Sequence, residues 1–486
     1  MDKQSPIKIA LPKGRLLAET AALLQESGWG LSGYREGGRF YRLKSRRFPD
    51  VSIKVFQEKD IPIQVAVGNY DLGICGLDWI EELLVKYPSS ALVKVKNLGF
   101  GEAVLYMAGS RAAGLSTIEE AKARQAVVRI ASEYPNLAES LAVKFRLRRF
   151  NIFPVWGAAE VYPPESADLV LVTGRAEEEL FNYDLESVSK VLDSSAFLIA
   201  NKSSWEIKDL SEVLTSIYDK KLVVGEKPPS PAKGLPEMEV QRLSEQPRKS
   251  RIFGEIPAEG VVCLALPDGH QQLPTLHLLN KAGIQVDDYP SAGGDRRPAI
   301  DLANVMVKVI RPQDMPLQVA NGNFDLAITG RDWLKEHLCQ FPSSPVAELL
   351  DLKFGKVKIV AVVSGELAVT DAYGLRQLSA ERLVPLRVAS EYVNIADKYA
   401  RDNHIGMYRV VPTWGASEAF LPEDADLLIE NTQTGRTLAR HNLKIIDTLF
   451  ESTACLIGNT ASAFNADKGK RIKSITETLR TAVEDI

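Results

Sequence analysis

The sequence has few residues suited to redox or metal chemistry and no surplus of positive charge. Its 486 residues include four cysteines and five histidines, and none of them shows the spacing of a metal site or a redox pair. The formal net charge is −4, so the chain lacks the basic field that holds nucleic acid. We expect buried free thiols at all four cysteines, Cys75, Cys263, Cys339 and Cys455.

Long apolar segments are also absent from the sequence. No run approaches the roughly 18 residues that a membrane-spanning helix needs. The first twenty residues lack the apolar stretch of a secretory signal, so we expect a cytoplasmic protein. Hydrophobic residues make up 45% and charged residues 25% of the chain, which is an ordinary balance for a globular protein with a sizeable core.

A long internal repeat organises the chain. The segment "VGNYDLGICGLDWIEELLVKYPSS" from Val67 aligns without gaps on "NGNFDLAITGRDWLKEHLCQFPSS" from Asn321. Further matches, such as "RIASEYPNLA" with "RVASEYVNIA", keep a separation of about 254–258 residues. This separation is far longer than a solenoid repeat. It predicts a tandem duplication, with a first copy at 1–224, a linker rich in Pro, Glu and Lys at 225–260, and a second copy at 261–486.

Within each copy, short apolar strands alternate with amphipathic helices. The alternation predicts an α/β fold with parallel sheets that are covered by helices. Midway through each copy, "AVLYMAG" and "VKIVAVVSG" have the character of strands that cross into a second α/β lobe. We therefore expect each copy to have two α/β lobes around a cleft.

The stretch "ADLLIENTQTGRTL", Ala425 to Leu438, has the pattern of a strand, a glycine turn and a helix start. The expected strand ends at Glu430, and Gly435 permits close approach of a ligand to the backbone. N–H groups at a helix N-terminus favour an anion, and Thr434, Arg436 and Thr437 add donors. The pattern therefore predicts a sugar phosphate site, although a turn capped by threonine in any α/β protein explains it too.

Two cations follow the first strand, in "ALPKGRL". Lys13 and Arg15 lie beyond the carboxyl end of that strand, where doubly wound folds bind ligands. A pyrophosphate suits this pair, and a solvated loop is the alternative. The second copy has Asp268 and His270 at these two positions.

Four further features of the repeat are candidates for a structural or a ligand-binding role. Asp60 and Asp314 precede an early proline, and we expect them to cap helices. Arg311 is a possible substrate contact, as is Glu160, whose counterpart is Glu418. Trp156 and Trp414, which stand before these glutamates in the sequence, are more typical of core residues than of stacking platforms.

Taken together, the motifs resemble those of the ATP phosphoribosyltransferase family. The resemblance covers nearly all of both copies, and each copy is similar to the short form of the family. The motifs that carry it are "LPKGRL", "DIPIQVAVGNYDLGICGLD", "LGFGEAVLYMAG", "RIASEYPNL", "VWGAAE" and "ADLLIENTQTGRTLARHNL".

The resemblance implies a fold, a reaction and roles for particular residues. The fold would be two lobes like those of type II periplasmic binding proteins. The reaction would join N1 of the adenine of ATP to C1 of phosphoribosyl pyrophosphate (PRPP) with Mg²⁺, as the first step of histidine biosynthesis. Glu418 and Glu430 would contact the ribose, and Lys13 and Arg15 the diphosphate or ATP. The 5′-phosphate would bind at Thr434, Gly435, Arg436, Thr437 and Leu438.

The two copies depart from the family pattern in complementary ways. Copy one keeps the Lys13 and Arg15 loop, whereas acids at Glu177, Glu178 and Glu179 replace its phosphate turn. Copy two keeps the turn and lacks the cations. Since family members pair as dimers, we expect an intramolecular pseudo-dimer in which copy one supplies Lys13 and Arg15 to the PRPP lobe of copy two.

Other readings of the sequence remain open. Copy one is structural or regulatory in one of them, since the short form of the family needs a regulatory partner that resembles histidyl-tRNA synthetase. A non-catalytic sensor of nucleotides or amino acids with the same fold is a second reading. The absent signal sequence disfavours a third, a secreted solute-binding protein.

Overall fold

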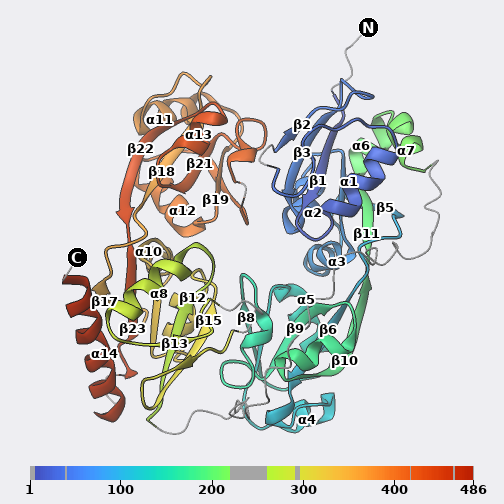
Figure 1. Ribbon diagram of the computed structural model, residues 1–486. Coiled ribbons are helices and arrows are strands. Elements are labelled where there is room, and N and C mark those ends of the chain that lie inside the picture. The colour runs from blue at the N-terminus through green and yellow to red at the C-terminus, as the bar shows by residue number, and fades with distance from the viewer. Residues whose placement is uncertain are drawn as a thin grey trace, which may run out of the picture. The chain divides into compact units, whose positions relative to one another are not determined.

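The computed structural model describes residues 6–38, 41–218, 260–290, 296–415, 417–462 and 466–484. The predicted linker at 225–260 lies outside the described residues apart from Gly260. Two compact units form, and they cut across the two copies. One unit holds the first lobe of copy one, and the other holds the second lobe of copy one together with copy two. Figure 1 labels the elements of each lobe.

A six-stranded sheet forms the first lobe of copy one. Strand β1 (Lys8–Lys13) pairs in parallel with its neighbours β3 (Ser52–Gln57) and β4 (Leu72–Gly76). Strand β11 (Ala196–Asn201) runs antiparallel to both β4 and β5 (Leu92–Asn97). In sheet order the strands are β2 (Arg42–Leu43), β3 (Ser52–Gln57), β1 (Lys8–Lys13), β4 (Leu72–Gly76), β11 (Ala196–Asn201) and β5 (Leu92–Asn97). The helices are α1 (Leu17–Glu26), α2 (Ile61–Ala66), α3 (Leu77–Lys86), α6 (Lys202–Ile207) and α7 (Ser211–Tyr218).

The second lobe of copy one is a five-stranded sheet with parallel pairing around β7. Its strands, in order, are β10 (Leu185–Ser194), β6 (Ala103–Ser110), β9 (Leu169–Gly174), β7 (Val128–Ser132) and β8 (Phe150–Pro154). Its helices are α4 (Ile118–Ala123) and α5 (Pro135–Lys144).

The first lobe of copy two has the same strand order as the five strands β3-β1-β4-β11-β5 of copy one. Its strands are β15 (Val305–Ile310), β12 (Val262–Pro267), β16 (Leu326–Gly330), β23 (Ala454–Asn459) and β17 (Val346–Asp351), beside a small pair of β13 (Val286–Asp287) and β14 (Ala299–Ile300). The helices are α8 (Gln272–Lys281), α9 (Met315–Ala320), α10 (Arg331–Gln340) and α14 (Ala466–Glu484). The last of these lies against this lobe, beside β17, as Figure 1 shows in dark red.

The second lobe of copy two has the same strand order as its counterpart in copy one. The strands are β20 (Tyr408–Pro412), β19 (Leu386–Ser390), β21 (Leu427–Thr432), β18 (Val357–Ser364) and β22 (Leu443–Ser452). The helices are α11 (Ala372–Glu381), α12 (Val393–Asp402) and α13 (Arg436–Arg440). The repeated strand order confirms the two-lobe α/β fold, of the kind found in type II periplasmic binding proteins, and its duplication.

The sheets are mixed, so the expectation of parallel sheets is wrong in part. The chain leaves each first lobe, builds the second lobe, and returns. The returning strand inserts into the first sheet against the direction of its neighbours, as β23 does between β16 and β17. Apolar residues of these strands form separate cores in the lobes, because each lobe buries its sheet under its own helices. In the described part of the chain no helix is long and apolar enough to cross a membrane.

Candidate active site

The predicted phosphate turn of copy two joins β21 to α13. Gly435 has a φ of +69°, a left-handed conformation that glycine adopts without strain. The side chains of Thr434, Arg436 and Thr437 are exposed, whereas Leu438 is buried. The three exposed side chains are therefore available to a ligand, whereas Leu438 could contact a ligand only through its backbone.

Two details of this turn differ from the sequence prediction. The N–H of Gly435 donates to the Thr432 hydroxyl oxygen at 3.0 Å, so this donor is already engaged. The helix α13 has five residues, too few for a substantial macrodipole. The first-turn N–H groups of Arg436 and Thr437 lack intrahelical acceptors, as at any helix start, and they are the donors that remain for an anion.

Glu430 lies inside β21 rather than at its end, since the strand continues to Thr432. Its carboxylate accepts hydrogen bonds from the Ser417 hydroxyl and from the N–H of Asn431. Burial, followed by the negative charges of Glu391 and Glu418, raises the pKa of Glu430 to about 8. Near neutral pH this carboxyl is therefore protonated, and it can both donate and accept a hydrogen bond.

A hydrogen-bonded chain of residues that the sequence reasoning did not single out supports this site. The Tyr392 hydroxyl donates to Asp332 at 2.6 Å and accepts from the amide of Asn431 at 3.0 Å. Asp332 also accepts from the Ser452 hydroxyl at 2.7 Å. The chain links α10 of the first lobe to β21 of the second. The repeated "SEY" motif was the available signal, since it contains Glu391 and Tyr392.

The corresponding turn of copy one is filled by its own acid. Oε2 of Glu179 accepts the N–H of Arg175 at 2.9 Å, and Glu179 aligns with Thr437 of copy two. The position of Glu430 is taken by Val172, which is buried. Copy one therefore has neither the open turn nor the half-buried acid of copy two.

Lys13 and Arg15 lie in the first compact unit, Lys13 as the last residue of β1 and Arg15 on the loop between β1 and α1. The Lys13 ammonium is 5.4 Å from the centroid of the Tyr41 ring. Arg15 pairs with two buried carboxylates, Glu58 at 2.6 Å and Asp78 at 3.1 Å. These acids fix the guanidinium of Arg15, so the loop is more strongly ordered than a solvated turn.

Buried ion pairs join the second lobe of copy one to the first lobe of copy two. The Glu165 carboxylate binds Lys308 at 2.6 Å and also Arg297. The Lys308 side chain is 2% exposed and that of Glu165 is 5% exposed. Burial, followed by the charge of Arg297, lowers the pKa of Lys308 to about 8. This pairing places the two copies in direct contact within the second compact unit.

Asp314 contributes to the same contact. Asp314 and Asp60 stand at the N-cap positions of α9 and α2 as predicted, each followed by an early proline, but neither side chain makes a capping hydrogen bond. The Asp314 carboxylate instead accepts the N–H of Trp156 at 3.0 Å and the hydroxyl of Tyr162 at 3.4 Å. The Trp156 ring packs edge-on against Trp333 of copy two, with 5.6 Å between ring centroids. Trp156 is thus an interface residue.

The remaining candidates, Arg311 and Glu160, lie in a network of charges at this contact. Asp268 pairs with Arg296 at 2.9 Å and with Arg311 at 3.2 Å. Glu160 of copy one lies 3.7 Å from Arg296, and burial raises its pKa. A side chain at Gly157 would approach Arg311 to 3.2 Å, so glycine there leaves room for this arginine. Arg296 and Arg311 are thus already paired with acidic side chains of the protein.

Comparisons with known proteins agree with this arrangement of two related halves. The model of the ATP phosphoribosyltransferase family matches residues 57–220 and 311–481, once in each copy. An ATP phosphoribosyltransferase of Chlorobaculum parvum is 33% identical over 226 residues, which cover 46% of this chain and 73% of that protein. One from Solibacter usitatus is 33% identical over 222 residues, 45% of this chain and 72% of that protein.

Solved structures align with lower similarity. The ATP phosphoribosyl transferase (HisG:HisZ) complex from Thermotoga maritima aligns at 21% identity and a TM-score of 0.38, over 46% of this chain and 100% of the aligned chain. The alkanesulfonate-binding protein SsuA from Xanthomonas axonopodis aligns at 10% identity and a TM-score of 0.29, over 46% of this chain and 73% of that one.

Proposed function

This chain belongs to the ATP phosphoribosyltransferase family, and we propose that it has one complete transferase site, built on the phosphate turn of copy two. Its reaction joins N1 of the adenine of ATP to C1 of PRPP and releases pyrophosphate, which is the first step of histidine biosynthesis. The observation that carries the proposal is the contrast between the turns. Glu179 occupies the turn of copy one, whereas Thr434, Arg436 and Thr437 are exposed in copy two.

The residues of the turn suit the 5′-phosphate of PRPP. The hydroxyls of Thr434 and Thr437, the Arg436 guanidinium and two backbone N–H groups converge on one turn, and charge-assisted hydrogen bonds of this kind are the stronger ones. Glu430 and Glu418 serve the ribose hydroxyls. Glu430 is protonated near neutral pH, so it binds a hydroxyl without adding a full negative charge beside the phosphate.

Copy one supplies the cations for the departing pyrophosphate in this proposal. In the contact described above, Asp268 in the first lobe of copy two is linked through Arg296 to Glu160 in the second lobe of copy one. The reciprocal pair of lobes has Lys13 and Arg15 in place of Asp268 and His270. By analogy we propose that Lys13 and Arg15 serve the site of copy two; Arg15 pairs with the carboxylates of Glu58 and Asp78.

The protein must align the substrates and stabilise the developing charge, and covalent catalysis is not needed. Binding must place the ring nitrogen of ATP in line with C1 as the bond to pyrophosphate breaks. Mg²⁺, carried in by the substrate, neutralises charge on the departing pyrophosphate. The described residues contain no group of three or more His, Cys, Asp or Glu side chains that would hold a metal ion. No protein nucleophile is required.

Location and partners follow from the same proposal. A cytoplasmic location gives the enzyme access to ATP and PRPP. A regulatory subunit that resembles histidyl-tRNA synthetase is a candidate partner. The alternative function is a sensor that binds a nucleotide without turnover, favoured by the loss of ligand residues from each copy.

The deciding experiment is turnover of the purified chain with ATP, PRPP and Mg²⁺, followed by formation of phosphoribosyl-ATP. Product from the chain alone supports a self-sufficient transferase. PRPP binding without product points to a required partner. Failure of both, with folded protein, contradicts the proposed site and favours the sensor.

A further inference from the structure

Two hydrogen bonds hold the carboxyl group of Glu430, one on each oxygen. The Ser417 hydroxyl donates to Oε2, and the N–H of Asn431 donates to Oε1 at 2.9 Å. Ser417 opens the short helical turn η6 (Ser417–Phe420) and is 2% exposed. Glu418, the second acid proposed for the ribose, follows it directly in the chain. Since the last torsion of a glutamate is intrinsically broad, these two bonds fix the plane of the carboxyl group.

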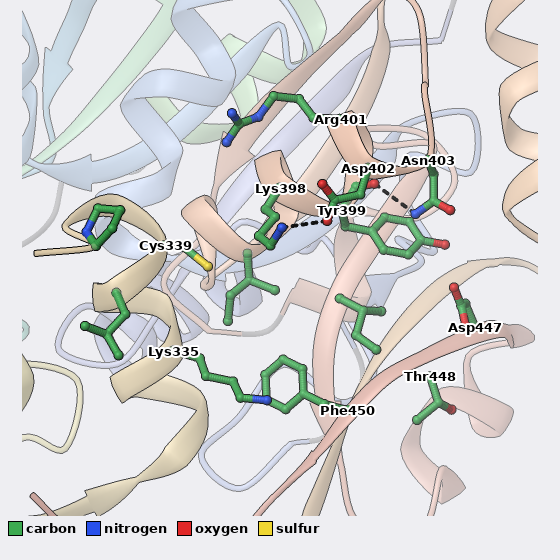
Figure 2. Close-up of a pocket in the computed structure, with 14 residues that line it drawn as sticks. Lys335, Cys339, Lys398, Tyr399, Arg401, Asp402, Asn403, Asp447, Thr448 and Phe450 are labelled. Carbon is green, nitrogen blue, oxygen red and sulfur yellow. Dashed lines mark hydrogen bonds and ion pairs between the residues drawn. The ribbon is translucent and has the colours of Figure 1, made fainter. Parts of the chain in front are cut away.

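The Asn431 end of this arrangement is anchored on the seam between the lobes of copy two. The Asn431 amide donates to the Tyr392 hydroxyl at 3.0 Å, and that hydroxyl donates to Asp332 at 2.6 Å. Asp332 lies in the first turn of α10, and Tyr392 stands at the N-cap of α12. Figure 2 shows later turns of the same two helices, with Cys339 on α10 and Lys398 on α12. One support of the Glu430 carboxyl is therefore built into packed helices of both lobes.

The duplication separates the anchor from the residues around the acid. The anchor occurs in both copies, since Tyr392 and Asp332 are matched by Tyr134 and Asp78. The acid and its two partners occur in copy two alone, where Ser417, Glu430 and Asn431 stand in place of Ala159, Val172 and Thr173. Ala159 and Val172 are buried apolar residues. Packing of the shared fold therefore does not require a hydroxyl at this position, and the hydroxyl accompanies the acid.

We propose that Ser417 is a positioning residue of the ribose site, which holds the Glu430 carboxyl beside Glu418 so that both acids contact the ribose hydroxyls. This inference rests on the proposed function and adds the residue that orients one of its two acids. Ser417 itself does not contact the substrate, because it is buried and its hydroxyl is engaged by Glu430. Without this hydroxyl the carboxyl keeps only the Asn431 bond and turns away from the ribose.

Ser417 also acts on the charge of Glu430. Three groups that can become negative face this carboxyl, namely Glu391, Glu418 and the Tyr392 hydroxyl. Burial, followed by the charges of Glu391 and Glu418, raises the pKa of Glu430, whereas the bond from Ser417 lowers it. A donor binds a charged carboxylate more strongly than a neutral carboxyl. Loss of the Ser417 hydroxyl should therefore destabilise the chain more as Glu430 loses its proton, which a simple packing defect would not do.

Kinetics of the full chain with ATP, PRPP and Mg²⁺ test the role in the site. Ser417→Ala introduces the residue of copy one and should lower kcat/KM for PRPP about tenfold, the ordinary effect of one lost hydrogen bond to an acid. The KM for ATP should stay unchanged. Ser417→Thr keeps the hydroxyl and should restore most of the activity, and Ala159→Ser in copy one is the matched control with native kinetics. Native kinetics in Ser417→Ala, or an equal rise in KM for both substrates, overturns the proposal.

Thermal unfolding tests the same contact without any substrate. The deficit in Tm of Ser417→Ala relative to the native chain should widen as the pH rises from about 6 to about 9. In a Glu430→Val background, which has the residue of copy one, the deficit caused by Ser417→Ala should be constant with pH. A deficit that is constant in both backgrounds overturns the proposal.

Failure of the proposed function gives a different result. If calorimetry shows that the native chain binds neither PRPP nor ribose 5-phosphate, the proposed function fails and the ribose role of Ser417 fails with it. The unfolding measurements then still decide whether Ser417 holds Glu430. Binding of PRPP by the native chain together with native kinetics in Ser417→Ala rejects the positioning role alone.

Discussion

The two turns at 167–180 and 425–438 share a strand and an origin, and they differ in what fills them. In copy one, Glu179 accepts the N–H of Arg175 within the turn, whereas in copy two the aligned residue is Thr437, whose side chain is exposed. In copy two, the acid Glu430 stands where copy one has buried Val172. One copy bonds an N–H of its turn with an acid of its own, while the other bonds the Gly435 N–H with Thr432 and keeps its polar side chains exposed.

The same comparison shows what copy one has kept. Glu165 and Tyr162 of copy one bind Lys308 and Asp314 of copy two, and their counterparts Glu423 and Lys54 occur in the reciprocal pair of lobes. Glu165, Lys308 and Asp314 are thus matched in the other half by Glu423, Lys54 and Asp60, whereas Tyr162 is matched by Phe420. Residues that would bind substrate are divided between them, with the cations in copy one and the phosphate turn in copy two.

The largest effect should come from breaking the retained contact. Glu165→Gln leaves Lys308 and Arg297 buried beside a neutral group, and loss of one partner of a buried ion pair costs roughly 3–5 kcal/mol. We expect the second compact unit to unfold at a much lower denaturant concentration. Calorimetry and denaturant titration measure this, with Glu451→Gln at the exposed Lys356–Glu451 pair as the control. An unchanged midpoint for Glu165→Gln would show that the copies do not depend on this contact.

Exchanging the turn residues comes next. Thr437→Glu gives copy two the acid of copy one, and a carboxylate at the turn both repels the phosphate and occupies its donors. We expect kcat/KM for PRPP to fall about 100-fold, which is about 2.7 kcal/mol. The reciprocal change Glu179→Thr in copy one is the matched control, and it should leave turnover as it was. Similar losses from both variants would mean that both turns bind substrate.

Much of this contrast was predictable from sequence, because it rests on local patterns. The strands around β12 and β21 are short apolar runs, and the glycine turn and the duplicated motifs stand out without a structure. Contacts between distant residues were not predictable. Asp314 has the sequence signature of a helix cap, yet it binds Trp156 of the other copy, since pairing across 158 residues leaves no local pattern. The raised pKa of Glu430 likewise depends on burial and on the charges of Glu391 and Glu418, which only folding brings near.

A smaller effect tests whether copy one serves the site of copy two. Lys13→Ala removes one cation without disturbing the Arg15 ion pairs, and loss of a single charge contact to a departing anion typically costs about ten- to thirtyfold in rate. We expect kcat/KM to fall by that factor with an unchanged Tm. Asp268→Ala at the aligned position of copy two should leave kcat/KM intact. If Lys13→Ala has normal kinetics, the division of one site between the copies is wrong.

The smallest effect, taken over a single pH unit, is a pH dependence that only copy two should show. The folded pKa of Glu430 is about 8, above its ordinary value of 4.5. Below pH 4.5 both the folded and the unfolded chain hold the proton, so the contribution to stability is fully present. Between 4.5 and 8 the unfolded chain loses the proton while the folded chain keeps it. Stability therefore falls as pH rises, by on the order of 1 kcal/mol between pH 6 and 7.

Glu430→Gln removes this titration while it keeps a group that can donate and accept hydrogen bonds. The Tm of the native chain should therefore fall steadily relative to that of this variant as the pH rises from 5 to 8. Val172→Leu, at the aligned position of copy one, is the control for a change of packing without a charge, and its difference from the native chain should be constant with pH. If the Tm of the native chain and that of Glu430→Gln change equally with pH, the Glu430 carboxylate is charged in the folded chain. The ribose would then lie beside a negative charge.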